Sequence, residues 1–287
     1  MKISIIVPIY KGNRYIDNIT TMVDNNYKTA IKELSDLSLE LILVNDYPDI
    51  AIEADSLNKT YDWEISINPN KVNQGIHQSR VNGLSVSTGN YITFLDQDDK
   101  IEDNFVLTQL KAIKDCDIVV GNGYRMFGDN AKTIYRNSKK QKLATVEKTY
   151  LYAANQIVSP GHCLIKKEAI PEEWLKYIVK DNGGDDLFLW MLMFSKNAKF
   201  AMNPECVYTH VDTGENVSLD INVMLKSADN CVELMRECGS IKKKSLNTYA
   251  RRIRFLKAIN GKSKIKKITA YITNLDICFY KLYAYYR

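Results

Sequence analysis

The stretch from Asn73 to Asp99 constrains the fold of this chain more than any other. It predicts a loop, a helix over 76–87, a turn at 88–90 and a buried strand over 91–95 that ends in Asp96-Gln97-Asp98-Asp99. Acids at the carboxyl end of a core strand lie where open α/β sheets bind ligands. Because clustered carboxylates repel one another, a divalent cation is one explanation of the cluster. An acidic turn that simply ends the strand is the other.

Strands and helices alternate over the first hundred residues. Apolar runs at 3–9, 39–44 and 63–67 predict strands, and apolar residues at helical spacing from Tyr15 to Val23 predict a helix after the first strand. This order is typical of an α/β fold with a mostly parallel, doubly wound sheet flanked by helices. Since each strand ends in polar residues, the strand ends are expected to line one crevice, as in nucleotide-binding proteins.

Two common phosphate-binding loops are absent from the sequence. No GxGxxG follows the first strand and no GxxxxGK[ST] occurs anywhere, which argues against a dinucleotide dehydrogenase and a P-loop NTPase. Bound phosphates would instead be neutralised by a metal on the acid cluster and by nearby cations such as Lys71 and Arg80. Either side chain could equally be a solvated surface charge. Six cysteines without a CxxC pair or a regular spacing predict reduced thiols.

The middle of the chain contains a second pair of acids. The predicted elements before it are helix 103–114, strand 117–121, a hairpin or long loop over 122–146, a turn leading into a strand over 157–165, and a helix from Pro171. Asp185 and Asp186 then begin an apolar helix, where acids complement the helix dipole by about 0.3–1 kcal/mol each. A carboxylate base held at a rigid helix start is the alternative. A last strand over 206–211 contains His210, and a polar loop over 212–216 follows it.

The tail, from about residue 218 to 287, has a helical pattern and most of the basic excess. After Met235 it contains 14 basic residues and 2 acidic ones, together with many tyrosines. Cationic, tyrosine-rich helices suit an anionic bilayer surface, and a helical annex with a solvated basic face is the alternative. Nucleic acid is a third option, but no recognised binding module accompanies the charge. The longest wholly apolar run, 187–194, is far too short to span a bilayer.

Five motifs, in this order, resemble those of the family-two glycosyltransferases with the GT-A fold. They are Ser4-Ile5-Ile6-Val7-Pro8-Ile9-Tyr10, Val44-Asn45-Asp46, Asn73-Gln74-Gly75 with Ser79-Arg80-Val81-Asn82-Gly83, Phe94-Leu95-Asp96-Gln97-Asp98-Asp99, and Asp185-Asp186 with Leu189-Trp190. The family has Asn at the position of Lys11, Asp at that of Asn45 and Glu at that of Asp185. The resemblance implies a GT-A nucleotide-sugar-binding and catalytic domain over 1–215, with a basic, tyrosine-rich helical extension over 216–287.

The resemblance also implies a role for each matching residue. Asp98 would bind Mn²⁺ or Mg²⁺ against the diphosphate, with Asp96 and His210 as further ligands. The nucleotide-sugar donor would be bound by Pro8, Tyr10, Asp46, Lys71, Asn73, Gly75, Arg80, Asp96 and Gln97. Asp186 would deprotonate the acceptor hydroxyl, with Asp185 as the alternative base. Because the metal stabilises the departing nucleoside diphosphate, no general acid is needed.

The implied function is transfer of one sugar, with inversion, from a nucleotide-diphosphate sugar to a hydroxyl of a glycan or lipid-linked glycan. A UDP-sugar is the expected donor, surface polysaccharide biosynthesis the expected process, and no nucleic acid partner is expected. Lipid-linked acceptors lie at the inner face of the plasma membrane, which implies a cytoplasmic protein in peripheral contact with anionic membrane. Because Asn45 departs from the family's Asp, a catalytically inactive nucleotide-sugar or glycan-binding module is the alternative.

Overall fold

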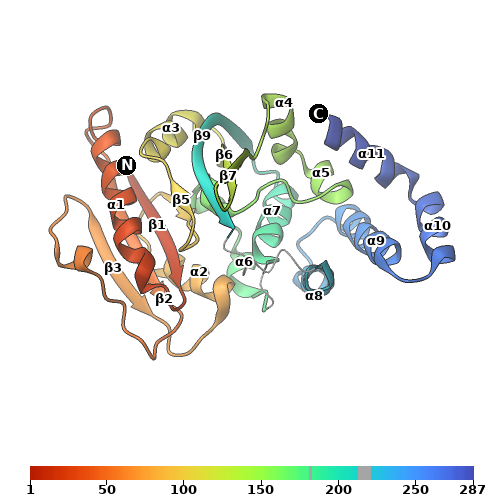
Figure 1. Ribbon diagram of the computed structural model, residues 1–287, viewed down its shortest axis with the longest axis horizontal. Helices are drawn as coiled ribbons and strands as arrows, with labels where there is room; N and C mark the ends of the chain where they lie inside the picture. Colours follow the sequence, from red (N-terminus) through yellow and green to blue (C-terminus); the bar gives the residue numbers. More distant parts are fainter. Residues whose placement is uncertain (181–182, 213–220) are drawn as a thin grey trace. The chain divides into compact units, whose positions relative to one another are not determined.

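The computed structural model describes residues 1–180, 183–212 and 221–287 (Figure 1). They form two compact units. The first unit comprises Met1–Arg136, Ile157–Ile170 and Ala198–Glu215, and the second comprises Asn137–Gln156, Pro171–Asn197 and Asn216–Arg287. The predicted domain boundary at 215/216 falls outside the described residues and stays a prediction. The second unit also takes up two segments that precede it.

The first unit is built on one mixed sheet. Its first four strands are β1 (Lys2–Ile9), β2 (Ser38–Asn45), β3 (Glu64–Pro69) and β4 (Tyr91–Phe94). They are parallel to one another and lie in the order β3-β2-β1-β4. The other strands are β5 (Lys100–Ile101), β6 (Ile118–Phe127), β7 (Asn130–Thr133), β8 (Cys163–Lys166) and β9 (Phe200–Asp212). The predicted α/β fold with a mostly parallel sheet is confirmed.

The sheet continues from β4 through β8, β6 and β9 to β5. β8 is antiparallel to both β4 and β6, whereas β6 and β9 are parallel to each other. The hairpin that β6 forms with β7 realises one of the two options for residues 122–146. β6 is longer than the strand expected at 117–121, and the two-residue β5 has no strand-like pattern of its own. β9 pairs with both strands, so the bounds of β5 and β6 depend on tertiary pairing and not on local sequence alone.

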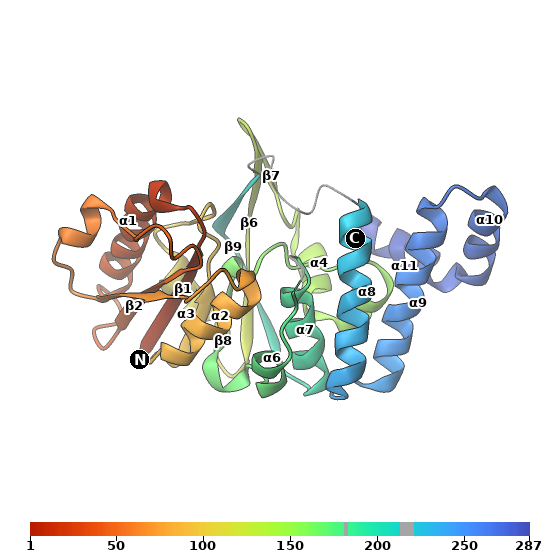
Figure 2. The same cartoon turned by 90° about the horizontal axis from the view of Figure 1, so that it is seen from below.

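Helices cover both faces of the parallel strands (Figure 2). They are α1 (Asn13–Ala30), α2 (Gly75–Val86) and α3 (Phe105–Ile113). Ile16, Ile19 and Val23 of α1 are fully buried in the core formed with alternate residues of β1 and β2. α2 covers the other face and approaches it closely. A Cβ on Gly83 would lie 2.3 Å from Ile6 Cγ2, so a residue larger than glycine would push α2 off the sheet.

The buried carboxylate of Glu40 fixes the turn that sends the chain from α2 into β4. It accepts hydrogen bonds from the Thr88 amide (2.6 Å), the Thr88 hydroxyl (2.7 Å) and the Ser4 hydroxyl. Burial alone would raise its pKa, but these hydrogen bonds and the ammonium of Lys2 outweigh it and lower the pKa to about 2. Glu40 therefore stays ionised and holds the strand that ends in the acid cluster.

The described part of the second unit is helical. Its helices are α4 (Ser138–Gln141), α5 (Glu147–Tyr152), α6 (Glu172–Lys176), α7 (Asp185–Ser195), α8 (Ile221–Cys238), α9 (Lys243–Asn260), α10 (Lys264–Thr273) and α11 (Leu275–Tyr286). α7 is the centre of its core, because Leu187–Phe194 is buried throughout. The helical tail agrees with the pattern in the sequence. All six cysteines are free thiols, as predicted.

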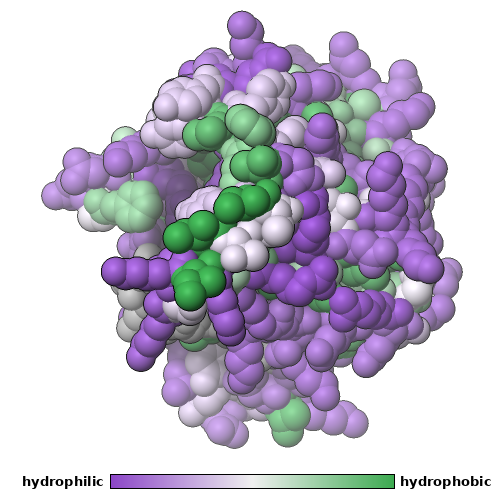
Figure 3. Space-filling view, turned by 90° about the vertical axis from the view of Figure 1, so that its right-hand side faces the viewer, coloured by the Kyte–Doolittle hydropathy of each residue, from purple (hydrophilic) through white to green (hydrophobic). Residues whose placement is uncertain are grey.

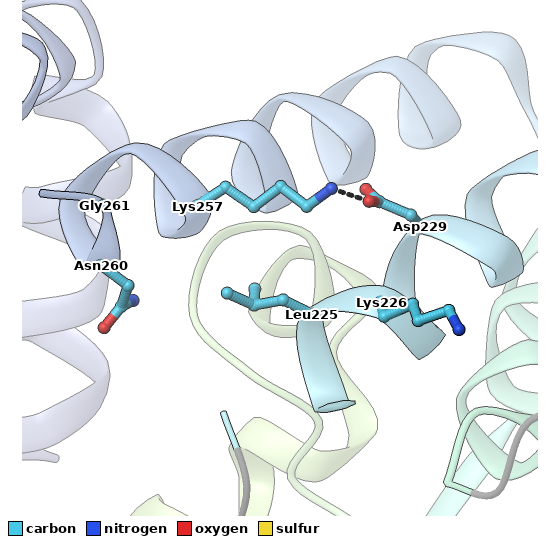
Figure 4. Close-up of a pocket in the computed structure, with 6 residues that line it drawn as sticks. All are labelled: Leu225, Lys226, Asp229, Lys257, Asn260 and Gly261. Carbon is cyan, nitrogen blue, oxygen red and sulfur yellow. Dashed lines mark ion pairs between the residues drawn. The ribbon is translucent and has the colours of Figure 1, made fainter. Parts of the chain in front are cut away.

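α8 and α9 are joined by an ion pair between Asp229 and Lys257 (Figure 4). The pair lies at a small, open pocket lined by Leu225, Lys226, Asp229, Lys257, Asn260 and Gly261. Its one acid, Asp229, is already paired, and none of the predicted site residues lines the pocket. Over the stretches that the structure describes, no helix is both long and apolar enough to cross a membrane.

Candidate active site

The carboxyl ends of β1, β2 and β4 meet at one edge of the sheet. Ile9 is paired with Asn45, and Ile6 with Phe94. The ladder continues one residue beyond, since the Asp46 amide donates to the Ile9 carbonyl at 2.8 Å. The Tyr10 region, Asp46 and the Asp96–Asp99 cluster therefore share one edge, as the parallel sheet requires.

Asp96 is neutralised by the first unit itself. One carboxylate oxygen pairs with the guanidinium of Arg80, a residue that is almost completely buried in α2. The other accepts a hydrogen bond from the Ser159 hydroxyl at 3.0 Å. Arg80 is thus not a solvated surface charge, and Asp96 is held by two partners. Ser159 was missed in the sequence because it lies 63 residues along the chain from Asp96 and matches no motif.

Asp99 is directed toward β9. Its buried carboxylate accepts hydrogen bonds from the Tyr208 hydroxyl and from the Val211 amide (3.0 Å), and it contacts His210 Nδ1 at 3.0 Å. Burial lowers the pKa of His210, but the hydrogen bond and the charge of Asp99 raise it more, so the net shift is upward. With Nδ1 engaged by Asp99, Nε2 is the nitrogen that His210 would offer to a ligand.

Asp98 lies in a partly buried and strongly negative environment. Burial, followed by the charges of Asp99 and Asp96, raises the pKa of Asp98 to about 6. Among the described residues, no three His, Cys, Asp or Glu side chains form a ready-made metal cage. Mg²⁺ commonly binds one or two carboxylates and takes its other ligands from substrate phosphates and water. The half-buried Asp98 fits that mode, in which the donor completes the metal shell.

The loop after β1 is clamped by Gln97. Its amide accepts from the Tyr10 backbone N–H at 2.9 Å and donates to the Tyr10 carbonyl at 3.2 Å. The Tyr10 ring is 45% exposed and meets Tyr47 edge to face, with ring centroids 5.3 Å apart. Lys11 Nζ lies 4.7 Å from the Tyr47 centroid. Gln97 therefore holds an aromatic surface with a cation at the strand ends, and Tyr47 and Lys11 join the candidate site.

Asp46 organises the loop that leads into α2. Its carboxylate accepts hydrogen bonds from the backbone amides of Gln74 (2.7 Å) and Gly75 (3.0 Å) and from the Asn70 side chain (2.8 Å). Gly75 has a φ of +82°, which favours glycine and turns its N–H toward Asp46. The conformation of the predicted donor-binding segment therefore depends on Asp46.

Asn45 needs to be an amide in this structure. Its Nδ2 donates to the Ile50 carbonyl at 2.8 Å, and its Oδ1 accepts from the Tyr47 amide at 3.0 Å. A carboxylate could accept the second hydrogen bond but could not donate the first. The departure from the family's Asp thus has a structural reason, because Asn45 closes the loop after β2.

Three further predicted residues contribute less to this geometry. Pro8 is half-buried in β1, whereas Lys71 and Asn73 are exposed in the loop before α2. The Asn73 side chain accepts a hydrogen bond from the Gly75 amide at 3.1 Å. Lys71 forms no ion pair with any carboxylate of the described ranges. It has the exposure of a solvated charge that a phosphate could reach.

Asp185 and Asp186 belong to the second unit and differ in exposure. Both lie in the first turn of α7, with Gly184 as the N-cap. Asp185 is only 3% exposed, and its carbonyl accepts a hydrogen bond from the Trp174 indole. Asp186 is half-buried, and its carboxylate accepts from the Asn155 side chain at 2.8 Å. A general base must reach the proton that it removes, so Asp186 has the better geometry of the two.

His162 contacts the acid cluster indirectly, through Tyr208. Its buried ring stacks between Tyr135 and Tyr208, with centroids 6.0 Å and 5.2 Å away, and Nδ1 lies 2.8 Å from the Gly121 carbonyl. Burial lowers the pKa of His162 to about 4. The neutral ring therefore backs Tyr208, whose hydroxyl donates to Asp99.

Acid should destabilise the protein through His162. The unfolded chain binds the proton near pH 6.5 and the folded chain only near pH 4, so this contribution is complete above pH 6.5 and is lost between the two values. The wild type should lose about 3 kcal/mol of unfolding free energy toward pH 4 that His162→Gln does not lose. Urea unfolding of both proteins from pH 7.5 to 4.5 measures the difference. Parallel pH dependences would contradict a neutral buried His162.

Known proteins resemble this chain in sequence and in fold. The sequence profile described as Glycosyl transferase family 2 matches residues 4–174. The chain is 33% identical over 127 residues to the glycosyltransferase GlyA of Streptococcus pneumoniae serotype 4, a match that covers 43% of this chain and 17% of GlyA. It is 29% identical over 126 residues to the glycosyltransferase GlyG of the same organism, which covers 42% of this chain and 39% of GlyG. The chain thus spans less than half of either relative.

A solved structure extends the likeness to nearly the whole chain. S. aureus TarS 1–349 in complex with UDP-GlcNAc superposes with a TM-score of 0.59 at 16% identity, over 98% of this chain and 90% of that chain. At this identity the likeness shows the fold alone. Together with the strand order, it shows that the chain has the GT-A fold. Since the family profile matches more than half of the residues, the chain belongs to glycosyl transferase family 2.

Proposed function

We propose that this protein is a metal-dependent, inverting glycosyltransferase that moves one sugar from a UDP-sugar to a hydroxyl group. The observation that carries the proposal is the set of contacts made by the Asp98 carboxylate. Among the described residues, its carboxylate accepts no side-chain hydrogen bond and forms no ion pair, whereas Arg80 and Ser159 hold Asp96 and residues of β9 hold Asp99. Asp98 would therefore be the main protein ligand of a cation that arrives with a diphosphate, and the diphosphate would supply further oxygens.

Asp98 would hold Mn²⁺ or Mg²⁺, with Asp96 and His210 Nε2 as further contacts. Such an ion, when bound, stabilises the negative charge of the departing nucleoside diphosphate. Lys71 would add a positive charge from its exposed loop. Arg80 would act indirectly, because its guanidinium forms an ion pair with Asp96 and orients that carboxylate.

The uracil and ribose would lie at the ends of β1 and β2. Tyr10, supported by Tyr47, offers an aromatic face, and Asp46 Oδ2 receives one hydrogen bond and keeps acceptor capacity for a ring N–H. Pro8, Asn73, Gly75 and Gln97 would shape the same pocket through the loops that they close. The UDP-GlcNAc bound to TarS supports a UDP-sugar as the donor class.

Asp186 would act as the general base. Its exposure and the hydrogen bond from Asn155 favour it over the buried Asp185. It would take the proton of the acceptor hydroxyl while the oxygen attacks the anomeric carbon. A single displacement of this kind inverts the anomeric centre. The chain itself then supplies one base and needs no second carboxylate acid, which separates this chemistry from that of glycosidases.

The acceptor would be a glycan or a lipid-linked glycan used in surface polysaccharide biosynthesis. Since lipid-linked acceptors are confined to a membrane, we place the enzyme at the cytoplasmic face of the plasma membrane, in peripheral contact with anionic lipid. The rival function, an inactive nucleotide-sugar or glycan-binding module, rested on Asn45. That residue has a structural role in the loop after β2, so the rival keeps no observation of its own.

A thermal-shift screen of nucleotide sugars tests the proposal. UDP-sugars with Mn²⁺ should raise the unfolding temperature by several degrees, because a ligand at a hundred times its Kd adds about 2.7 kcal/mol to the folded state. The same sugars with EDTA should give a much smaller shift. A shift with GDP- or CMP-sugars alone would contradict the UDP assignment. Donor binding without any release of UDP in the presence of acceptors would favour the inactive module.

A further inference from the structure

A row of large apolar side chains runs along the exposed side of α10 and α11 (Figure 3). We call it the apolar stripe. Its members, with their exposed fractions, are Ile265 (77%), Ile268 (60%), Ile272 (65%), Leu275 (54%), Phe279 (69%) and Leu282 (53%). Steps of three and four residues place them on one side of the helices, and the row continues across the break at Asn274. An exposed row of this size marks a contact surface, because isolated apolar residues are normal but contiguous patches are not.

The stripe is not the side by which these helices pack on the second unit. Ala270 of α10 and Ile277 of α11 are buried with Phe255 of α9, and Ala284 is buried with Leu143 and Ala153. The start of α11 is held by the ion pair of Asp276 with Arg251. The two helices therefore pack on the second unit through Ala270, Ile277 and Ala284, while the apolar stripe lies on their exposed side.

The charges beside the stripe select its partner. The segment from Lys262 to Arg287 contains six basic residues and one acid, Asp276, which is already paired with Arg251. Lys262, Lys264, Lys266, Lys267 and Lys281 form no ion pair with a carboxylate in the ranges that the structure describes. If a second copy of the chain packed on the stripe, its lysines would face these lysines, and the repulsion between like charges would cost free energy. An anionic surface would satisfy them.

We propose that the stripe inserts into the headgroup region of an anionic lipid bilayer, with the adjacent lysines on the lipid phosphates. Apolar side chains on one side of a helix and lysines near it are the features of interfacial helices, whose affinity grows with buried apolar area and with anionic lipid. This assigns named residues to the membrane contact and rests on the proposed function only for its biological purpose. The contact itself requires neither donor nor acceptor.

Sedimentation with lipid vesicles tests the proposal on the full chain. The vesicles contain phosphatidylcholine alone or phosphatidylcholine mixed with phosphatidylglycerol, without nucleotide sugar. Ile268→Ser/Phe279→Ser, with one change on each helix, should bind the mixed vesicles at least about tenfold more weakly than the wild type. Ile67→Ser/Val86→Ser is the matched control, since both residues are about half exposed in the first unit, and it should bind like the wild type. All four side chains are exposed, so folding should persist.

A second variant separates charge from apolar contact. Lys264→Gln/Lys266→Gln/Lys267→Gln should weaken binding to the mixed vesicles by roughly fivefold for each lysine removed, and added salt should narrow the difference. Equal binding of the wild type to both kinds of vesicle would overturn the anionic preference. Unchanged binding of Ile268→Ser/Phe279→Ser would overturn the insertion of the stripe.

Self-association is the competing outcome. In analytical ultracentrifugation, the wild type should not form a dimer through the stripe. The wild type and Ile268→Ser/Phe279→Ser should therefore have the same oligomeric state. Such a dimer, together with no vesicle binding, would assign the stripe to a second copy and overturn the proposal. The thermal shift with UDP-sugars should be the same in the wild type and the stripe variant. If UDP-sugars shift the unfolding temperature of neither protein, the proposed function is contradicted. The vesicle result would still test the membrane contact, because that contact requires no donor.

Discussion

Asp98→Ala is expected to lower the rate of sugar transfer by at least about a thousandfold, because the ion that it would hold stabilises the leaving diphosphate. Release of UDP from the donor in the presence of acceptor measures the rate. Asp129→Ala, which removes an exposed acid from the β6–β7 turn, should leave the rate unchanged. If the wild type works equally well in excess EDTA, the metal assignment is wrong.

The same position separates loss of function from loss of fold. Because the pKa of Asp98 is raised to about 6, its charge opposes folding at neutral pH when no cation is bound. The penalty begins above the unfolded pKa of 3.8 and is complete above pH 6. Asp98→Asn should therefore raise the unfolding temperature of the metal-free protein at pH 7 while abolishing the response to Mn²⁺. A lowered unfolding temperature would mean that Asp98 is a structural residue.

Asp186→Asn is expected to lose about 10²–10⁴-fold in the rate of transfer, which is the usual contribution of a general base. Asparagine keeps an oxygen for the hydrogen bond from Asn155 but cannot accept the proton. Binding of the UDP-sugar, measured by calorimetry, should stay within a factor of about two because the donor residues belong to the first unit.

Asp185→Asn is the companion variant. Asp185 is buried at the start of α7, so its replacement should affect stability more than the rate. A fully folded Asp185→Asn protein that cannot transfer sugar would show that Asp185, and not Asp186, is the base. Equal loss in both variants would show that the two acids act as a unit.

The order of strands and helices in the first half of the chain could be predicted because its signals are local. Apolar runs at β1 and β2 and helical spacing in α1 are each visible within one window of sequence, and alternation then favours parallel pairing. The acid cluster was visible for the same reason, since it follows a core strand directly. β5 escaped notice because two residues carry no period, and only its pairing with β9 makes it a strand.

The partners of the acids could not be predicted, because they are distant in the sequence. Ser159 lies 63 residues from Asp96, and Tyr208 lies 109 residues from Asp99. The separation between a structural and an available carboxylate depends on these contacts. From the resemblance to the family, Asp96, Asp98 and Asp46 were all expected to contact the metal or the donor. In the folded chain Asp96 and Asp46 have hydrogen-bond or ion-pair partners, whereas the carboxylate of Asp98 has no side-chain partner among the described residues.

The sequence by itself determined the α/β class, the position of the acids at a strand end, the pair of acids at a helix start and the basic helical tail. These are properties of short segments, where propensity and period decide. The tertiary structure decided which acid is neutralised, which of Asp185 and Asp186 is less buried, why Asn45 is an amide, and which side of α10 and α11 remains exposed. Each of these depends on what the folded chain buries or pairs, and burial and pairing are made by residues that only folding brings together.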